Sequence, residues 1–373
     1  MRVLLVTGVV AGGVGRHVEM LVRGLAARGH DPVVACPGAV AQRFAFGRDV
    51  IDLSTGTRPD PAGDLRAVAT LRRAMTRADV VHAHGLRAGA LAVAARASLG
   101  RRRRPRLVVT SHNAPPEGRA ARVVYALLEA VVARGADLVL AVSPDLIVRA
   151  RSAGATRTAL AVVPAARAER LDVQAARRDL ADELGLGPGE RVVLAVGRLA
   201  PQKRLDLAVQ AHAHLLAHAH LLGDAHAAAP HLVIAGDGPG RAELEAVAAR
   251  AGSRVHLLGH RHDVPALLAA ADVVLSTARW EGQPVWLQEA LQQGAAVVAT
   301  DVGGTAQVVA DAAVLLPVDA GPAQVAEQVG RVLADTILRA DLRRRALARS
   351  AQLPTEDDAL EAAFTAYLGN DVD

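Results

Sequence analysis

Short apolar and β-branched runs alternate with longer Ala-, Leu- and Arg-rich stretches along almost the whole 373-residue chain. Such runs are typical of strands buried on both faces of a parallel sheet, and the stretches between them show helical periodicity. The alternation predicts an α/β fold with helices on both faces of each sheet. The expected strands are 3–8, 32–36, 80–84, 107–112, 138–143 and 160–164, then 191–197, 231–236, 254–259, 273–277, 295–300 and 313–317.

The two sets of strands follow the same scheme, which predicts two doubly wound, Rossmann-like domains in tandem. We expect one domain over residues 1–165 and a second over residues 166–350. The region 165–190 is charged and ends in Gly-Pro-Gly, which indicates a connecting segment with a short helix. Residues 351–373 contain a final helix without a following strand, and we expect that helix to cross back to the first domain.

Composition excludes several classes of protein. The formal net charge is only +5, and the sequence has no aromatic-basic RNA motif, Cys/His finger or basic heptad region, so we expect no nucleic-acid partner. The single cysteine, Cys36, excludes a disulfide within the chain. No stretch approaches the ~20 apolar residues of a membrane-spanning helix. The first ten residues resemble a strand more than a signal peptide, so we expect a cytoplasmic protein.

A glycine-rich turn occupies residues 7–21, TGVVAGGVGRHVEML, between an expected strand and an amphipathic helix. Glycines let the backbone approach a ligand closely, and the start of the following helix favours an anion. A nicotinamide dinucleotide would require an acidic residue at the end of the next strand. That strand ends in Ala-Cys-Pro, so the sequence disfavours a dinucleotide.

The stretch GRLAPQKRLD, residues 197–206, contains Lys203, the only lysine in the chain. Arg198 and Lys203 would lie at the carboxyl end of a parallel strand, where ligands bind in such sheets. A solvated turn is the alternative interpretation. Because a lysine ammonium is not interchangeable with a guanidinium, the one retained lysine favours a tight phosphate site, and a diphosphate would suit the two cations.

Two glutamates flank an expected helix start in WEGQPVWLQEALQQGAAVVATDVGGT, residues 280–305. Pro284 suits a first helical position, so Glu281 would lie in the preceding loop and Glu289 inside the helix. Two carboxylates placed in this way could bind the hydroxyls of two sugar rings. The first amides of the helix would face a phosphate between them. Two glutamates at this spacing, without such flanks, are usually surface charge.

Histidines follow two strands of the first domain. His112 ends one strand, and His82 and His84 end the previous one, so each could face a ligand or serve a structural role. In the low-complexity repeat AHAHLLAHAHLL, His214 and His218 could share a helix face with a metal. No third ligand occurs at a supporting spacing, and we expect no metal site.

These motifs together resemble the GT-B retaining glycosyltransferases of glycosyltransferase family 4, over nearly the whole chain. The matching pieces are GGVGRHV, HAHG, SHN, VSPDL, VGRLAPQK, IAGDGP, LLGHRHDV and EGQPVWLQEALQQGAAVVATDVGG. The last is the most specific, with two glutamates separated by seven residues ahead of a strand and a Gly-Gly loop. HNA, VSPDL and EGQP are similar to the versions found in high-GC actinobacteria.

The resemblance implies a transferase that moves a hexose-type sugar from a nucleotide-diphosphate sugar with retention of configuration and without a metal or other cofactor. It implies that Arg198 and Lys203 hold the diphosphate, that Glu281 contacts the donor sugar and that Glu289 binds the ribose. The implied donor-binding residues are Gly13, Arg198, Lys203, Gln283, Pro284, Val285 and Glu289. The implied catalytic residues are His112, Glu281, Arg198 and Lys203.

The resemblance leaves the acceptor to the first domain, where Arg16 and His112 are candidate contacts. The basic run RRRRPR, residues 101–106, could attract an acidic lipid surface or be a solvated loop. We expect a lipid-linked or cell-envelope glycan as acceptor, with peripheral contact to the inner membrane face, and keep a small soluble acceptor as the alternative.

The sequence departs from the family pattern at several positions. Gln307 replaces a common glutamate, Gln283 replaces an aromatic residue, and the usual Asn-Gly is absent at residues 165–166. These changes affect the expected donor identity and interdomain geometry. A sugar-nucleotide 2-epimerase and a non-catalytic nucleotide-sugar-binding protein are the alternatives; the glutamate pair argues against the first.

Overall fold

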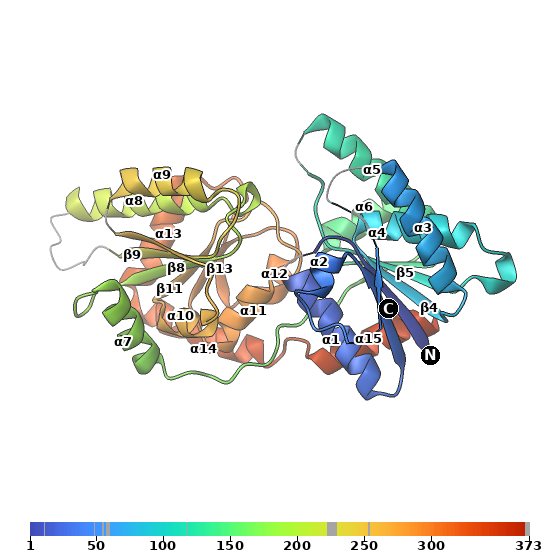
Figure 1. Ribbon diagram of the computed structural model, residues 1–373. Helices are drawn as coiled ribbons and strands as arrows, with labels where there is room; N and C mark the ends of the chain where they lie inside the picture. The colour runs from blue at the N-terminus through green and yellow to red at the C-terminus, as the bar shows by residue number, and fades with distance from the viewer. Residues whose placement is uncertain are drawn as a thin grey trace. The chain divides into compact units, whose positions relative to one another are not determined.

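The computed structural model describes residues 1–10, 12–47, 49–53, 56, 60–116, 118–221, 230–252 and 254–369. For residues 218–221 it describes the backbone only. The chain divides into two compact units (Figure 1). Unit 1 comprises Met1–Pro164 and Pro354–Asp373, and unit 2 comprises Ala165–Leu353.

Unit 1 contains a seven-stranded parallel sheet in the order β3-β2-β1-β4-β5-β6-β7. The register places Leu5 of β1 opposite Val34 of β2 and His82 of β4. Its strands are β1 (Arg2–Thr7), β2 (Asp31–Cys36), β3 (Val50–Asp52), β4 (Val80–His84), β5 (Arg106–Ser111), β6 (Leu138–Ala141) and β7 (Thr158–Leu160).

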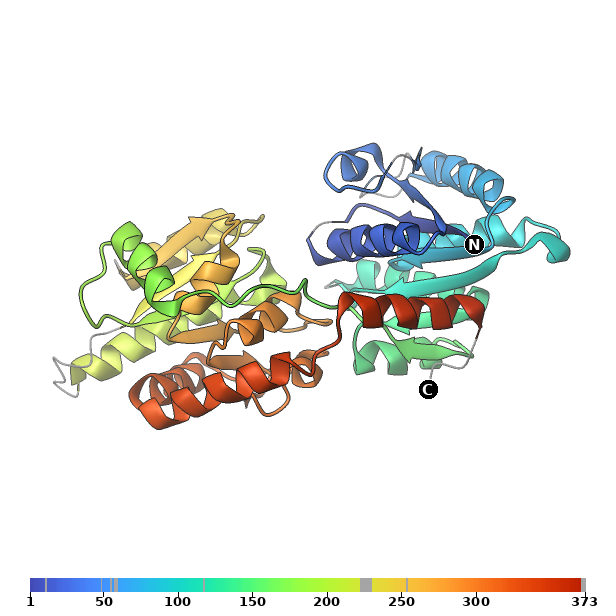
Figure 2. The ribbon, with the colours of Figure 1, turned by 90° about the horizontal axis from the view of Figure 1, so that it is seen from below.

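Helices cover both faces of this sheet. The apolar sides of α3, α4 and α5 pack on one face, and α1 and α15 lie next to each other on the other (Figure 2). The helices of unit 1 are α1 (Gly13–Ala27), α2 (Gly38–Ala41), α3 (Pro61–Met75), α4 (Leu86–Ala97), α5 (Arg119–Gly135), α6 (Pro144–Ser152) and α15 (Glu356–Leu368), with a 3-10 turn η1 (Arg101–Arg103).

Unit 2 contains a six-stranded parallel sheet in the order β10-β9-β8-β11-β12-β13. Its strands are almost entirely Val, Leu, Ile and Ala, as expected for strands buried on both faces. They are β8 (Val192–Val196), β9 (His231–Ala235), β10 (Val255–Gly259), β11 (Val273–Ser276), β12 (Val297–Thr300) and β13 (Ala313–Leu316).

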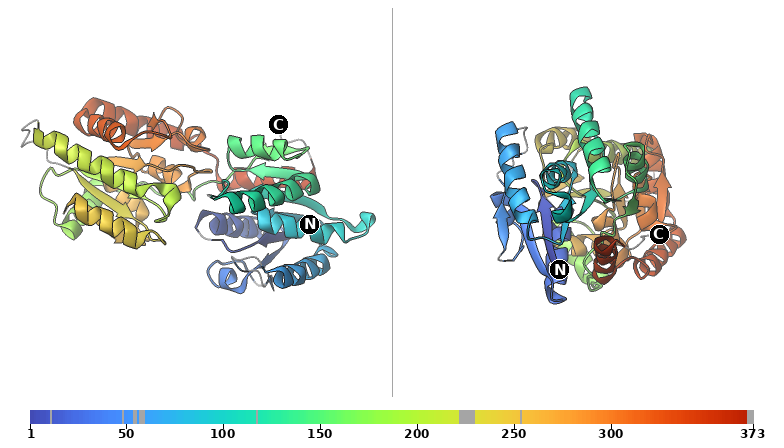
Figure 3. Two further views of the ribbon diagram at one scale, coloured as in Figure 1. Left: turned by 90° about the horizontal axis from the view of Figure 1, so that it is seen from above. Right: turned by 90° about the vertical axis from the view of Figure 1, so that its right-hand side faces the viewer.

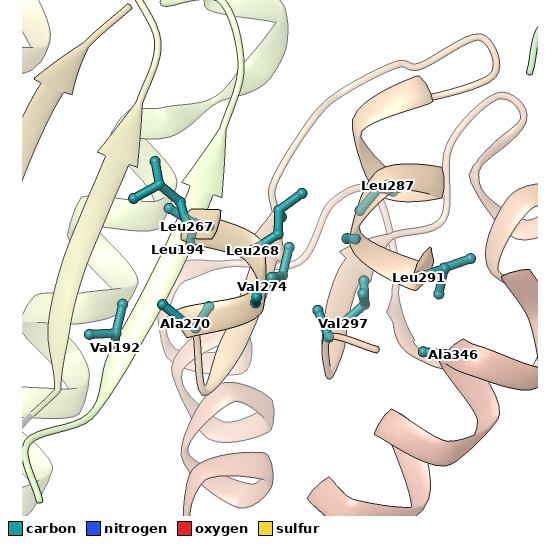
Figure 4. Packing of buried hydrophobic residues seen from close by; sticks show 14 of the residues in the cluster. Val192, Leu194, Leu267, Leu268, Ala270, Val274, Leu287, Leu291, Val297 and Ala346 are labelled. Atoms are coloured by element: carbon teal, nitrogen blue, oxygen red, sulfur yellow. The ribbon is translucent and has the colours of Figure 1, made fainter. Parts of the chain in front are cut away.

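Two helical layers enclose the sheet of unit 2 (Figure 3). One apolar cluster joins α8, α9 and α13 to one face, and another joins α7, α10, α11 and α14 to the other. Figure 4 shows Leu287 and Leu291 of α11 in the second cluster with Val297 of β12 and Ala346 of α14. The helices are α7 (Val173–Leu184), α8 (Leu205–Leu221), α9 (Arg241–Ala251), α10 (Val264–Ala270), α11 (Val285–Gln292), α12 (Thr305–Val309), α13 (Pro322–Ala334) and α14 (Thr336–Ser350), with a 3-10 turn η2 (Pro201–Lys203).

The predicted fold class, two doubly wound Rossmann-like α/β sheets, is confirmed. One short strand, β3, was not predicted, because its three residues carry no extended apolar run. The strand expected at 160–164 was misplaced: pairing with β6 occurs at Thr158–Leu160. The apolar run that suggested it is instead an extended segment whose Ala161 and Val163 are buried.

The last helix, α15, belongs to unit 1. It starts with a capping box in which the Thr355 hydroxyl accepts from the Asp358 amide at 3.2 Å and the Asp358 carboxylate accepts from the Thr355 amide at 2.8 Å. Its acidic first turns pair with α1 through Arg23–Glu356 and Arg28–Glu361. In the described part of the chain, every helix is too short or too polar to span a lipid bilayer.

Candidate functional site

In unit 2 the strand order reverses between β8 and β11. From β8 the chain continues outward to β9 and β10, and from β11 it continues in the opposite direction to β12 and β13. In open α/β sheets, ligands bind beyond the carboxyl ends of the strands at this reversal point. The loops at these two carboxyl ends carry Arg198 and Lys203 after β8 and Glu281 after β11.

Lys203 forms an ion pair with Glu281, which is 78 residues away in the sequence. The Lys203 Nζ donates to Oε1 of Glu281, and only 19% and 8% of the two side chains are exposed. The lone lysine therefore has a fixed position at the reversal point of the sheet. Arg198 is exposed, and its side chain makes no hydrogen bond or ion pair with any residue described.

Further hydrogen bonds tie the two loops together. The buried Thr277 hydroxyl lies 3.0 Å from the carbonyl of Lys203 and 2.8 Å from that of Arg204. The Gln202 side chain donates to the carbonyl of Trp280 at 2.7 Å. Arg204 adopts a left-handed conformation, φ 47°, which turns the chain into α8 directly after the lysine. The position of the ammonium group is thus set by both loops.

Close backbone contacts hold the neighbouring Gly-rich loop against Glu281. Gly303 has φ +56°, and a Cβ added there would lie 1.7 Å from the Glu281 carbonyl oxygen. The next amide, of Gly304, donates to the same oxygen at 3.1 Å. The Gly-Gly loop after β12 is therefore a support for the loop that carries Glu281.

Helix α11 begins at Val285, one residue later than expected, and Pro284 is the residue that precedes the helix. The expectation that Pro284 contributes an amide to a phosphate is wrong, because proline has no amide hydrogen. Its carbonyl instead accepts from the amides of Leu287 and Gln288. Gln283 and Val285 remain as half-buried amide-bearing candidates, and Glu289 is half-buried within α11.

Three glutamines in the middle of the same motif hold the segment that begins unit 2. The amides of Ala165, Ala168 and Leu171 donate to the side-chain oxygens of Gln288, Gln292 and Gln293 at 2.9, 3.2 and 3.0 Å, respectively. Gln293 also donates to the Glu169 carbonyl at 3.0 Å. The segment that lacks the usual Asn-Gly is thus held by side chains of the signature motif, a role that the sequence analysis missed.

In unit 1 the strand order reverses between β1 and β4. The Gly-rich turn follows β1, with Gly12 at φ 57° and Gly13 as the first residue of α1. His84 is the last residue of β4, and His112 directly follows β5. The candidates of unit 1, Gly13, Arg16 and His112, therefore come from elements at one edge of its sheet.

His112 belongs to a buried cluster of four histidines, with His17, His82 and His84. The Nδ1 of His84 lies 3.1 Å from the Nε2 of His112, and the ring of His17 lies 5.8 Å from that of His84. His17 comes from α1 and was not predicted, although it lies in the GVGRHV motif. Its Nδ1 and the Nε2 of His84 are buried without a hydrogen-bond partner in the described structure.

His82 connects this cluster to the last helix. Its Nδ1 lies 2.8 Å from the hydroxyl of Tyr367 in α15, and its Nε2 lies 2.7 Å from that of Thr110 in β5. Burial lowers the pKa of His17 to about 4 and that of His112 to about 3, and it lowers the pKa values of His82 and His84 well below the usual value. All four rings are therefore uncharged at neutral pH.

The described residues contain no group of three or more His, Cys, Asp or Glu side chains able to hold a metal. Of the two histidines that could share a helix face, His214 and His218, the side chain of His218 lies outside the described residues. In the basic run, Arg101–Arg103 form the exposed turn η1. The Arg104 guanidinium donates to the carbonyls of Leu99 and Ala97 at 3.2 and 3.1 Å.

Both halves of the chain are similar to known protein families. Residues 12–166 match the glycosyl transferase 4-like domain family, and residues 176–349 match the glycosyl transferases group 1 family.

Two curated relatives come from Streptomyces kanamyceticus. An alpha-D-kanosaminyltransferase is 29% identical over 204 residues, 53% of this chain and 49% of the relative. A 2-deoxystreptamine glucosyltransferase is 34% identical over 230 residues, 57% of this chain and 56% of the relative. The chain thus spans about half the length of these relatives.

Solved structures share the fold over the full chain. The structure of Anabaena HepE in complex with UDP-glucose superimposes with a TM-score of 0.79 at 21% identity, covering 99% of this chain and 100% of HepE. This similarity and the two parallel sheets agree with the GT-B fold that the sequence predicts. Residues 12–166 and 176–349 are thus similar to two glycosyl transferase domain families, and the fold of the chain is the GT-B fold.

Proposed function

We propose that the chain transfers a hexose-type sugar from a nucleoside-diphosphate sugar to an acceptor, with retention of anomeric configuration and without a metal. The observation that carries this proposal is the Lys203–Glu281 ion pair at the reversal point of the unit 2 sheet. In this ion pair a preorganised cation lies next to the carboxylate that we assign to the donor sugar. The exposed guanidinium of Arg198 follows the same strand and is available to a diphosphate.

The chemistry of such a transfer explains why cations matter in this region. When the bond between the sugar and the diphosphate breaks, negative charge develops on the departing phosphate. A cation already held in place stabilises that charge without reorganisation, which is where preorganised electrostatics lowers the barrier most. In this proposal Lys203 and Arg198 neutralise the leaving group, and the leaving phosphate takes the proton of the acceptor hydroxyl.

The remaining candidates receive roles within their own units. In unit 2 we assign Glu281 to the donor sugar, Glu289 to the ribose, and the amides of Gln283 and Val285 to the diphosphate. For unit 1 we propose that the Gly13 amide binds a phosphate. Arg16 and His112 bind the acceptor there, with His112 next to the transferred sugar.

The acceptor proposal includes two classes of molecule. The basic turn η1 supports a lipid-linked or cell-envelope glycan met at an anionic membrane face, because exposed arginines near such a surface are attracted to it. The name of the 2-deoxystreptamine glucosyltransferase supports a small soluble acceptor instead. Both classes belong in the test.

The test is a donor screen followed by a transfer assay with the full chain. UDP-, GDP- and ADP-hexoses are screened by thermal shift, since a ligand that binds the native state raises the melting temperature. The HepE complex makes UDP-glucose the first donor to try. Transfer from the bound donor is then followed by NMR, which reports the anomeric configuration of the product, with and without EDTA.

Each outcome of this test is decisive. A product with the donor's configuration and EDTA-insensitive turnover support the proposal, whereas inversion or a metal requirement contradicts it. Donor binding without turnover on either acceptor class would favour a non-catalytic nucleotide-sugar-binding protein. Release of a free epimerised nucleotide sugar would favour an epimerase.

A further inference from the structure

A recess with a volume of about 620 Å³ lies in unit 1, at the amino-terminal half of its sheet. Its walls come from β1, β2 and β3, from the end of α3 and from the turn before β5. The floor is apolar and includes Leu4, Val33, Ile51 and Leu99. We call this feature the arginine recess, because five arginines also line it: Arg2, Arg72, Arg73, Arg77 and Arg103.

The positive charge of the arginine recess is largely uncompensated. Its described lining contains no aspartate or glutamate. Arg2 lies 3.4 Å from Asp31, and Arg73 donates to the Thr70 hydroxyl at 3.4 Å. The side chains of the other three arginines, Arg72, Arg77 and Arg103, make no hydrogen bond or ion pair with the residues that the structure describes.

These arginines converge from separate elements. Arg72 is in the last turn of α3, where a cation complements the helix dipole, and Arg77 follows that helix. Arg103 comes from η1, a turn that Arg104 anchors to the end of α4 through two carbonyls. The helix dipole explains only Arg72 and its neighbour Arg73 in the same turn. It does not explain why arginines from three elements surround one recess.

We propose that the arginine recess binds a small phosphorylated metabolite with at least two negative charges. An unpaired guanidinium group can donate two parallel hydrogen bonds to two oxygens of a phosphate. Several such groups around one recess can therefore bind more than one pair of phosphate oxygens. The apolar floor accommodates the organic part of such a molecule, as in typical small-molecule pockets. A concave recess of this size admits a whole ligand, whereas a flat bilayer would touch only its rim.

This site is separate from the region assigned to the transfer reaction. Leu4 and Val33 lie in the amino-terminal halves of β1 and β2. Gly13, His84 and His112 are at the carboxyl ends of the strands. The proposal therefore does not depend on the proposed function and can be tested without it.

The test measures binding of inorganic diphosphate and of ADP to the full chain by calorimetry. All proteins carry Lys203→Ala, so that the diphosphate region of unit 2 is weakened. The recess variant is R72Q/R77Q/R103Q, and the charge-matched control is R119Q/R122Q/R134Q, three exposed arginines of α5 that do not line the recess. Melting temperatures verify that each variant is folded.

We expect a single site whose affinity falls at least ~10-fold in the recess variant and stays within about 2-fold in the control, because charge-assisted hydrogen bonds to phosphate are lost only in the former. Equal affinities in the two variants would overturn the proposal. It would also be overturned if neither probe bound the Lys203→Ala protein. In that case, loss of sedimentation with phosphatidylcholine–phosphatidylglycerol vesicles in the recess variant alone would identify a membrane-contacting surface instead.

Discussion

At the scale of single residues, the ion pair between Lys203 and Glu281 is the central feature of unit 2. Glu281 is almost fully buried, and the ammonium group of Lys203 is its ion-pair partner. Removing one partner of a buried ion pair is costly because the other charge stays behind uncompensated. In the function that we propose, the same ammonium group also neutralises the donor diphosphate.

Lys203→Ala is expected to lower kcat/KM at least ~100-fold, because one preorganised contact to the developing phosphate charge is lost. Lys203→Arg should not restore activity, since the planar guanidinium does not reproduce the compact charge. The measurement is steady-state kinetics with the donor identified by the screen, and exposed Arg331→Ala is the control.

A second variant separates catalysis from folding. In Lys203→Ala the uncompensated Glu281 should lower stability by on the order of 3 kcal/mol. The double variant Lys203→Ala/Glu281→Gln should recover the melting temperature but not the activity. Near-wild-type turnover in Lys203→Ala would refute the assignment of the diphosphate contact.

The histidine cluster of unit 1 predicts a specific pH dependence of stability. Burial lowers the pKa of His17 to about 4 and that of His112 to about 3, and it also lowers the pKa values of His82 and His84. In the unfolded chain a histidine has a pKa of about 6.5. Below that pH the unfolded state takes up protons that the folded state does not.

The stability contribution of the cluster is therefore fully present above about pH 6.5 and is lost as the pH falls toward 4. At pH 5 each buried histidine should lower the free energy of unfolding by about 2 kcal/mol relative to its value above pH 6.5. Urea unfolding between these pH values measures this slope. His17→Leu should make it shallower, while exposed His214→Gln should leave it unchanged; identical slopes in all three proteins would contradict the prediction.

At the scale of elements, glycines determine how closely the loops of unit 2 approach one another. A Cβ on Gly236 would lie 1.8 Å from the Gly197 carbonyl oxygen, and one on Gly303 would lie 1.7 Å from that of Glu281. Backbone cannot move aside as a flexible side chain can. The geometry around Lys203 and Glu281 therefore depends on loops that follow four different strands.

Gly303→Ala is expected to displace the loop that carries Glu281 and to strain a left-handed residue, at a cost of about 1–3 kcal/mol. Donor affinity should fall at least ~10-fold, because misplaced charges lose preorganisation. Thermal shift with and without donor measures both effects. Gly321→Ala is the matched control, since a Cβ there meets no atom within 4 Å; equal behaviour of the two variants would show that the loop contact is not needed.

At the scale of the whole molecule, unit 1 includes the last helix of the chain, which follows all of unit 2 in the sequence. Tyr367 in α15 is buried, and its hydroxyl contacts His82 in β4. A Cβ added to Gly24 of α1 would lie 2.2 Å from the side chain of Leu360 in α15. Helix α15 is therefore an integral part of the unit 1 core.

Deletion of Pro354–Asp373 should destabilise unit 1 and leave unit 2 largely unchanged. Hydrogen–deuterium exchange should rise in β4, β5 and α1, which lose the apolar cover of α15 and the His82 hydrogen bond. Peptides of β8, β11 and β12 should keep their protection. Tyr367→Phe should cause a smaller loss in the same region and exposed Leu368→Ala none; equal exchange in both units would contradict this division.

The sequence by itself determined the two doubly wound sheets and the motifs at their carboxyl ends. Apolar runs and helical periodicity are local patterns, and the position of a motif after a strand places it at a sheet edge. The same patterns indicated that Arg198, Lys203, Glu281 and Glu289 would lie in unit 2. Local patterns also caused the errors, since a three-residue strand such as β3 carries too little signal and an apolar linker resembles a strand.

Only the tertiary structure decided which of these residues meet. The pairing of Lys203 with Glu281 depends on β8 and β11 being neighbours, and no spacing in the sequence encodes that contact. The cluster of His17, His84 and His112 likewise requires α1, β4 and β5 to pack together. Contacts between residues far apart in the chain follow from strand order and packing, whereas periodicity reports only a residue's own segment.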